Sequence, residues 1–345
     1  MKRLSASGKE RIVRIARLRL ASRLRRRGAG YILHRETIGA PAVLSFKDNF
    51  LGTVGFLEKM RGATLHEGTG RRVHIDLAPI RYLSVPVAIV LAAEFHRWSI
   101  VRHLRLRALQ PERWDPMVRN LLSHLGVFEL LEVRNRPHWS RGHDHVTLSP
   151  LQSGLRFDGR KIDQLQSRFN IVLQGFTKNP EVYAGMTEAA ENAVVHAYPA
   201  DFVPRHRFAG HRWWGASCLD LSNKSLRFFI FDQGAGIPFT LPTIGWYENI
   251  RAFAASLNVA PNDTVMLRAA LEVARTRTGQ ANRGLGLARM AEVIQGSVTG
   301  YLRIISGRGE IICHPDGTIE SRHHDTDIGG TLIEWSLPAD VFTAE

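Results

Sequence analysis

An alanine-rich segment in the second half of the chain constrains the fold more than any other feature. Residues 186–199 read MTEAAENAVVHAYP, a composition that predicts one helix ended by Pro199. Glu188, Asn192 and His196 follow one another at intervals of four, so they lie along one face of that helix. Asn192 can offer its carbonyl oxygen to Mg²⁺, and Glu188 can orient or deprotonate a water molecule. A polar stripe on an ordinary surface helix has the same spacing, so the segment alone leaves both interpretations open.

A glycine-containing loop follows an apolar strand further along the chain. The strand LRFFIF runs directly into DQGAGIP at residues 232–238. Gly234 and Gly236 permit a flat ligand to approach the backbone, and Asp232 can accept a hydrogen bond from an exocyclic amine such as that of adenine. An ordinary glycine-rich turn after a strand fits the same residues.

Two more glycine motifs come later. In NRGLGLARMAEVIQG, residues 282–296, Gly284 and Gly286 stand at the start of a predicted helix, where backbone amides bind phosphate, and Asn282 or Arg283 can add a donor. In GGTLIEWSLP, residues 329–338, a turn leads into a strand and brings Thr331 within reach of a phosphate.

Together these motifs resemble the nucleotide boxes of the GHKL superfamily, which includes gyrase and the histidine kinases. All four boxes occur in the family's order over residues 188–331. The matching or adjoining residues are Glu188, Asn192 and His196 in the first box, Asp232, Gly234, Gly236 and Ile237 in the second, Arg283, Gly284, Leu285, Gly286 and Leu287 in the third, and Thr331 in the last.

The resemblance implies an ATP-binding domain over residues 160–345, an α/β sandwich with a mixed sheet. It assigns the adenine amine to Asp232, Mg²⁺ to Asn192 and the attacking or transferred proton to Glu188. The amides of residues 284–287 would hold the triphosphate, and residues 239–283 would form the lid over ATP.

Among these ATPases, the boxes are most similar to those of bacterial anti-sigma-factor serine kinases, whose first box EAxxNAxxHAY resembles residues 188–198. Those enzymes phosphorylate Ser or Thr of partners that have a STAS domain. The chain ends soon after Thr331, so we expect no transducer domain of the gyrase kind. Residues 160–185 lack the signature of a phosphoaccepting histidine helix.

The first half of the chain predicts a separate α/β domain over residues 40–134. Its pattern indicates strands at 73–77 and 100–106 and helices at 85–98 and 116–125. This order resembles a STAS domain. The stretch 83–86 lacks that family's Asp-Ser-Ser-Gly run, and Ser84 fits a helix N-cap instead of a phosphoacceptor. Residues 135–159, rich in Pro, Gly, His and Ser, are the expected linker.

Positive charge gathers at the N-terminus. The net charge is +14, and residues 1–27 hold eleven Lys or Arg against one acid, Glu10. Apolar residues at roughly helical spacing predict a basic amphipathic segment over residues 1–35. This segment can contact nucleic acid, an anionic membrane or an acidic partner, or it can be a solubilising tail or a helix packed on its own protein.

Other residue types narrow the function further. Cys218 and Cys313 stand far apart, which predicts buried, reduced thiols. Two groups of His and Asp, residues 138–145 and 323–325, lack the spacing of a metal site and are expected in solvated loops. No apolar stretch is long enough to span a bilayer, so the predicted location is the cytoplasm.

We therefore expect a cytoplasmic, two-domain α/β protein that binds Mg-ATP and regulates a protein partner, STAS-like or of another kind. It would hydrolyse ATP or transfer the γ-phosphate to Ser or Thr, and a homodimer fits either activity. The alternative is an ATP-gated switch or effector without kinase activity, which engages nucleic acid or a membrane through residues 1–27.

Overall fold

The computed structural model describes residues 35–63, 72–102, 109–131, 146–171, 173–207, 209–276, 286–295 and 297–342. Within these ranges, Thr37–Leu65 and His74–Glu345 belong to one compact unit of the chain. Helices and strands alternate through it, which confirms the α/β class. None of the helices in the described ranges is long and apolar enough to cross a membrane.

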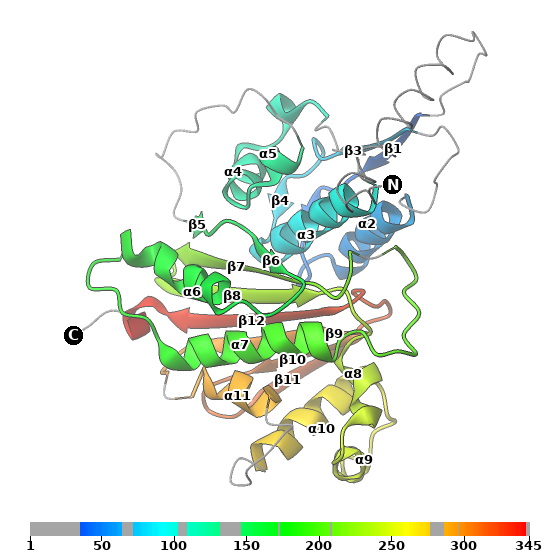
Figure 1. Ribbon diagram of the computed structural model, residues 1–345, viewed down its shortest axis with the longest axis vertical. Coiled ribbons are helices and arrows are strands. Elements are labelled where there is room, and N and C mark those ends of the chain that lie inside the picture. Colours follow the sequence, from blue (N-terminus) through cyan, green and yellow to red (C-terminus); the bar gives the residue numbers. More distant parts are fainter. Residues whose placement is uncertain are drawn as a thin grey trace, which may run out of the picture. The chain divides into compact units, whose positions relative to one another are not determined.

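An eight-stranded sheet lies at the centre of the second half of the chain (Figure 1). Its strand order is β11-β10-β9-β12-β8-β7-β5, and β6 also pairs with β7. The strands are β5 (Val146–Leu148), β6 (Gln152–Gly154), β7 (Trp213–Asp220), β8 (Ser225–Asp232), β9 (Tyr301–Ser306), β10 (Gly309–Cys313), β11 (Ile319–His323) and β12 (Thr331–Pro338).

Every pairing within this sheet is antiparallel, so the expected mixed sheet is wrong. The physical reason is that short turns join β7 to β8, β9 to β10 and β10 to β11, and a short turn reverses the chain direction. Residues 146–154, expected in the linker, instead form β5 and β6 at one edge of the sheet.

One face of the sheet is covered by α6 (Gly159–Ser167), α7 (Pro180–Val195), α11 (Gly286–Glu292) and part of α10 (Asp263–Thr276), and we call this the helix face. The side chain of Asn179 caps α7 by accepting a hydrogen bond from the Val182 amide, and Pro180 occupies the first turn. The helix therefore starts before the predicted residue 186, and it stops at Val195, short of Pro199.

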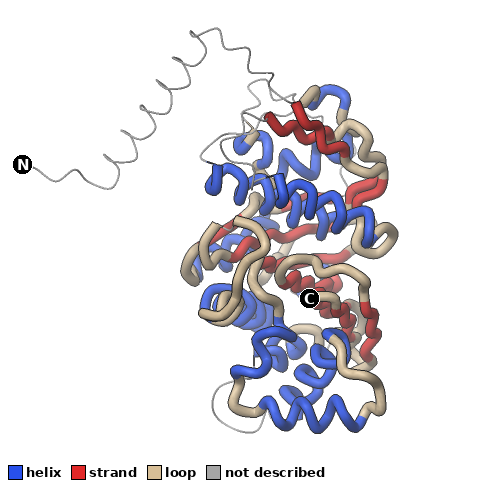
Figure 2. Tube along the Cα trace, turned by 90° about the vertical axis from the view of Figure 1, so that its right-hand side faces the viewer, coloured by secondary structure: helices blue, strands red, loops and turns tan. Residues whose placement is uncertain are grey.

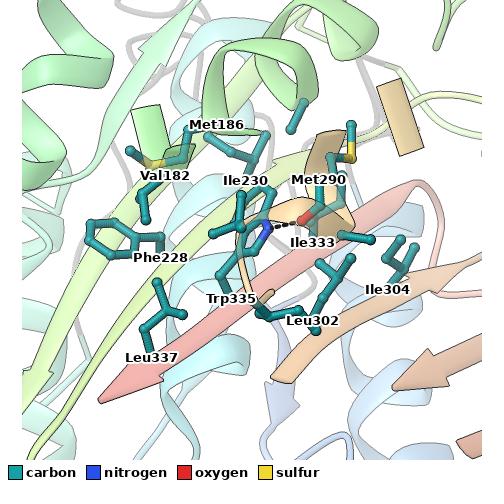
Figure 3. Close-up of a cluster of buried hydrophobic side chains, with 14 of the residues drawn as sticks. Val182, Met186, Phe228, Ile230, Met290, Leu302, Ile304, Ile333, Trp335 and Leu337 are labelled. Atoms are coloured by element: carbon teal, nitrogen blue, oxygen red, sulfur yellow. Dashed lines mark hydrogen bonds between the residues drawn. The ribbon is translucent and has the colours of Figure 1, made fainter. Parts of the chain in front are cut away.

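The core of the helix face is apolar and closely packed (Figure 3). Alternate residues of β8, β9 and β12 point to this face, so Phe228, Leu302 and Trp335 meet Met186 of α7. Trp335 is fully buried, and its indole nitrogen donates a hydrogen bond of 2.8 Å to the carbonyl of Met290. This contact fixes α11 on the sheet.

A helical group follows the second predicted box. It consists of α8 (Ile237–Thr240), α9 (Tyr247–Ser256) and α10 (Asp263–Thr276), and it has a small apolar core of its own. In both views these helices lie together at the lower end (Figure 2). They occupy most of the predicted lid, residues 239–283, of which 277–283 lie outside the described residues.

The described residues of the N-terminal part form two small sheets and four helices. β1 (Arg35–Gly39) pairs with β3 (Arg72–Asp76), and β2 (Val43–Leu44) pairs in parallel with β4 (Tyr82–Leu83). The helices are α2 (Phe50–Ala63), α3 (Val85–Arg102), α4 (Pro116–His124) and α5 (Val127–Leu130); short 3₁₀ turns occur at Pro111–Arg113, Arg168–Ile171, Leu241–Thr243 and Ala339–Phe342.

The predicted strand at 73–77 and the predicted helices at 85–98 and 116–125 correspond to β3, α3 and α4. The strand predicted at 100–106 is wrong at its start, because residues 100–102 continue α3; residues 103–108 lie outside the described part. The β-branched pair at 100–101 favoured a strand, but burial of an almost continuous apolar helix extends α3 instead.

The opposite face of the sheet carries buried polar groups, and we call it the polar face. Trp214 of β7 donates a hydrogen bond of 3.1 Å to Nδ1 of His96 on α3. Burial, with the charges of Arg212 and Lys161, lowers the pKa of His96 to about 4, so the ring is neutral and can accept this bond.

Further along the polar face, Glu310 accepts a bond from Arg303 at 2.8 Å and lies 2.6 Å from Nε2 of His324. His324 is buried, so the expectation of a solvated loop is wrong there, while His323 is exposed as expected. The group at residues 138–145 lies outside the described part. Cys218 and Cys313 are free and buried, which confirms that prediction.

Candidate functional site

Three polar side chains stand in register at one end of the helix face. Thr331, the first residue of β12, is opposite Asp232 at the end of β8 and opposite Ser306 at the end of β9. The hydroxyls of Ser306 and Thr331 are 2.8 Å apart, and the Ile237 amide donates to Ser306 at 2.7 Å. The second and last predicted boxes therefore meet across adjacent strands.

Asp232 is a buried carboxyl held by backbone amides. The Gly234 amide donates to its Oδ1 at 2.8 Å, and the Thr331 backbone also donates to it. Among the described residues, no cation forms an ion pair with it. Burial raises the pKa of Asp232 to about 7, although these two bonds oppose the rise.

Glu188 and Asn192 come from α7, which lies over this end of the sheet. Both side chains are partly exposed, and a side-chain hydrogen bond joins them. Gly286, the first residue of α11, lies directly against both: a Cβ at this position would collide with the Glu188 carboxylate and would lie 3.0 Å from the Asn192 amide nitrogen. The first and third predicted boxes therefore also meet, and a larger residue at position 286 would displace the Glu188 carboxylate.

The surroundings of Glu188 act on the pKa of its carboxyl group in both directions. Burial raises its pKa, and neighbouring Glu191 adds to the rise, while Arg289, His196 and the bond from Asn192 oppose it. Arg289 of α11 lies 3.9 Å from the carboxylate. A carboxylate with a raised pKa in a half-buried position is suited to taking up a proton.

The loop after β8 is held by the segment after α7. The Ala235 amide donates to the Ala197 carbonyl at 2.7 Å, and the Gln233 amide donates to the Tyr198 hydroxyl at 3.1 Å. Gly234 packs so closely on Ala197 that any Cβ would overlap its carbonyl oxygen. Gly234 is thus required for close approach, and these bonds fix the loop that carries Asp232.

The structure brings most of the predicted residues to this end of the sheet. Ile237 and Leu287 pack between the core of the helix face and the core of the α8–α10 group. Gly236 has a positive φ of 86° immediately before α8. His196 is the exposed C-cap of α7. Arg283, Gly284 and Leu285 lie outside the described residues.

Sequence reasoning missed three residues of the site. Ser306 is the polar end of the apolar strand β9 and precedes a glycine, a signal that resembles the Gly-Gly-Thr turn before β12. Tyr198 was visible in the first box but had no role assigned. Arg289 follows Gly286 by almost one helical turn, which would have predicted its position near Glu188.

A metal ion could be held here only together with another ligand. Among the described residues, no group of three or more His, Cys, Asp or Glu side chains could bind a metal. Mg²⁺ usually keeps several waters and binds one or two protein oxygens together with phosphate oxygens. Asn192 offers one such oxygen, and the phosphate oxygens of a ligand and water would have to supply the others.

No protein-family model matches the chain, and a comparison with curated proteins finds no match either. Function must therefore be inferred from the geometry of the site.

Proposed function

We propose that the chain is a regulatory protein that binds Mg-ATP at the end of the helix face and acts on the γ-phosphate, by hydrolysis or by transfer to Ser or Thr of a protein partner. The fold proposed for residues 160–345 is that of the GHKL ATPases, and residues 40–134 are proposed to be STAS-like. This assignment rests on the ordered motifs together with their convergence in space.

One observation carries the proposal. Asp232, Thr331 and Ser306 form a row across β8, β12 and β9 on the same face as α7, and the glycine that starts α11 touches Glu188 and Asn192. Four motifs separated by up to about 140 residues in the sequence thus supply neighbouring groups, and such convergence is typical of a ligand site.

Each residue has a role that its surroundings support. Asp232, held without a cation, accepts a hydrogen bond from the adenine amine. Asn192 supplies an oxygen to Mg²⁺, which when bound would neutralise phosphate charge. Glu188, whose pKa burial raises, takes the proton of the attacking water or hydroxyl. Thr331 and Ser306 hold the Asp232 loop in place.

The test is Mg²⁺-dependent binding and turnover of ATP by the full chain and its variants. D232N and N192A are expected to weaken binding by about ten-fold or more, which is the effect of losing one charge-assisted bond or one metal ligand. E188A is expected to keep binding and lose turnover. The matched control is D220N, a change at another buried aspartate, at the far end of β7. Failure of the folded wild type to bind ATP would refute the proposal.

A second candidate function follows from Arg289. Its guanidinium lies 3.9 Å from Glu188 and partly neutralises the group that would take the proton. In an ATP-gated switch this pairing would persist when nucleotide binds, and turnover would be absent. Incubation with ATP labelled at the γ-phosphate separates the candidates: labelled protein supports kinase activity, released phosphate supports hydrolysis, and binding with neither supports the switch.

The protein partner and a homodimer stay predictions. The role of the basic segment also stays a prediction, because residues 1–34 lie outside the described part. Removal of residues 1–27 tests the nucleic-acid and membrane alternative. A loss of salt-dependent binding to DNA, RNA or anionic vesicles is the outcome that the alternative requires.

A further inference from the structure

A pocket lies beside the loops of the proposed nucleotide site. Its volume is about 80 Å³, and it is lined by α2, α3, the segment 202–207 and the loops 233–235 and 327–329. Asp232, Glu188 and Asn192 are not among its described lining residues. A single water needs roughly 10–15 Å³ by this measure, so the pocket has room for several waters or one small polyatomic ion.

The charged groups of this pocket are mainly cationic. Its lining contains four arginines and two carboxylates, namely Arg61, Arg97, Arg205, Arg207, Glu58 and Asp327. Glu94 lies behind the lining and accepts bonds from Arg61 at 2.6 Å and from Arg97 at 2.8 Å. Counting Glu94 as well, four positive charges oppose three negative ones, so the pocket favours an anion.

Two lining residues present buried atoms without a hydrogen bond. Nδ1 of His206 and Oε1 of Gln233 have no partner among the described residues. The other polar atom of each ring or amide is used: Nε2 of His206 lies 2.8 Å from Glu58, and the Gln233 amide nitrogen donates to Glu94 at 2.8 Å. Buried polar atoms rarely stay without a partner, so both atoms have bonding capacity for a water molecule or a ligand in the pocket.

A hydrogen phosphate group matches this set of partners. Its oxygens accept bonds from guanidinium groups, and its hydroxyl can donate to Nδ1 of His206 or to Oε1 of Gln233. We propose that this pocket is a binding site for a small oxyanion of the phosphate type, either free or as a phosphomonoester. The site is separate from the proposed nucleotide site and shares a wall with it.

Residues of the shared wall contact the loops of the proposed nucleotide site, so a ligand in the pocket can affect those loops. Arg61 donates to the Ile328 carbonyl at 2.7 Å, and a Cβ on Gly329 would collide with the Arg61 guanidinium. Gln233, which also lines the pocket, immediately follows Asp232. Occupancy should therefore change the affinity for ATP. This change in ATP affinity rests on the proposed function, whereas the oxyanion site in the pocket does not.

The test is a titration of the full chain with inorganic phosphate. Calorimetry measures the affinity, and NMR monitors the ring proton signals of His206. We expect binding that shifts these signals, and an affinity reduced about ten-fold in R205E and in H206Q, since R205E replaces a positive charge with a negative one and H206Q removes a hydrogen-bonding ring. R251A is the control, because Arg251 is an exposed arginine on α9 that pairs with Glu248. Phosphate binding that is equal in wild type, R205E and H206Q, or binding without a shift of His206, would overturn the proposal.

A second experiment separates the two proposals. The affinity for a non-hydrolysable ATP analogue is measured with and without saturating phosphate, and we expect a change of about five-fold or more. Titration with glycerol phosphate as well as inorganic phosphate distinguishes a phosphomonoester from the free ion. An unchanged analogue affinity would refute the coupling, and absence of analogue binding with intact phosphate binding would refute the proposed function but not the pocket.

Discussion

The two faces of the sheet bury their carboxyl groups in opposite ways. On the helix face, Asp232 has backbone amides but no described cation as partners, and burial raises its pKa to about 7. On the polar face, burial alone would raise the pKa of Glu310, yet bonds and charges from His324 and Arg303 hold it below its usual value.

This difference is the one expected between a structural carboxyl group and a ligand-binding one. A paired carboxylate such as Glu310 has its bonding capacity satisfied within the protein, so it stabilises the fold. A carboxyl that is buried without a cation costs stability when it ionises, and it retains bonding capacity for a ligand. Asp232 is therefore the group that folding alone does not account for.

The largest expected effect breaks the apolar packing of the helix face. Trp335→Ala removes a fully buried indole that joins the sheet to α11 through Met290, so we expect a loss of about 3–5 kcal/mol in the free energy of unfolding. Urea denaturation followed by circular dichroism measures it. Leu51→Ala on α2 is the control, because that side chain is 56% exposed and should change little. Equal effects of the two variants would contradict the assigned core.

The second expected effect comes from weakening the polar contacts of Glu310 on the polar face. Glu310→Gln weakens two contacts, to Arg303 at 2.8 Å and to His324 at 2.6 Å, and should cost about 2–3 kcal/mol at neutral pH. Since the pKa of Glu310 is lowered in the folded chain, its contribution is present above its unfolded pKa and is lost as pH falls through the folded value. Unfolding measured at neutral and acidic pH checks this.

Glu320→Gln is the matched control for that experiment. Glu320 also pairs with a histidine, His314 at 2.9 Å, but its side chain is 69% exposed, and exposed pairs contribute little. A loss as large in Glu320→Gln as in Glu310→Gln, or a loss in Glu310→Gln that does not diminish in acid, would show that burial is not the source of the effect.

The sequence predicted features that depend on neighbouring residues and missed features that depend on contacts between distant strands. Local signals located the elements near the site: the alanine-rich helix, the apolar strand before Asp232 and the Gly-Gly-Thr turn before β12. The sequence did not predict the antiparallel order of the sheet or the buried pair of Glu310 and His324, because both depend on contacts between distant strands. Ser306 was missed for the same reason, since its role comes from register with Thr331.

The third effect sharpens the comparison by removing the unpaired charge. In the folded chain Asp232 has a raised pKa, so its ionisation lowers stability progressively as pH rises from about 4 to 7, above which the cost is constant. Asp232→Asn should therefore be more stable than wild type above pH 7, by about 1–2 kcal/mol, with no gain near pH 4. Denaturation at pH 8 and pH 4 measures the gain. A variant that is less stable at pH 8 would mean that Asp232 is a structural group.

The smallest expected effect on stability comes from a comparison of one buried serine on each face of the sheet. Ser306 and Ser336 are both buried serines on the neighbouring strands β9 and β12. Ser306 accepts a hydrogen bond from the Ile237 amide and contacts Thr331, while Ser336 points to the polar face. Ser306→Ala should cost about 1 kcal/mol, since it leaves the Ile237 amide without its acceptor, and it should also weaken ATP binding by loosening the Asp232 loop. Ser336→Ala should change neither. Thermal unfolding and nucleotide titration of the two variants measure this. If Ser306→Ala lost stability but bound ATP as wild type does, the hydroxyl row would be a support of the sheet end and not of the nucleotide loop.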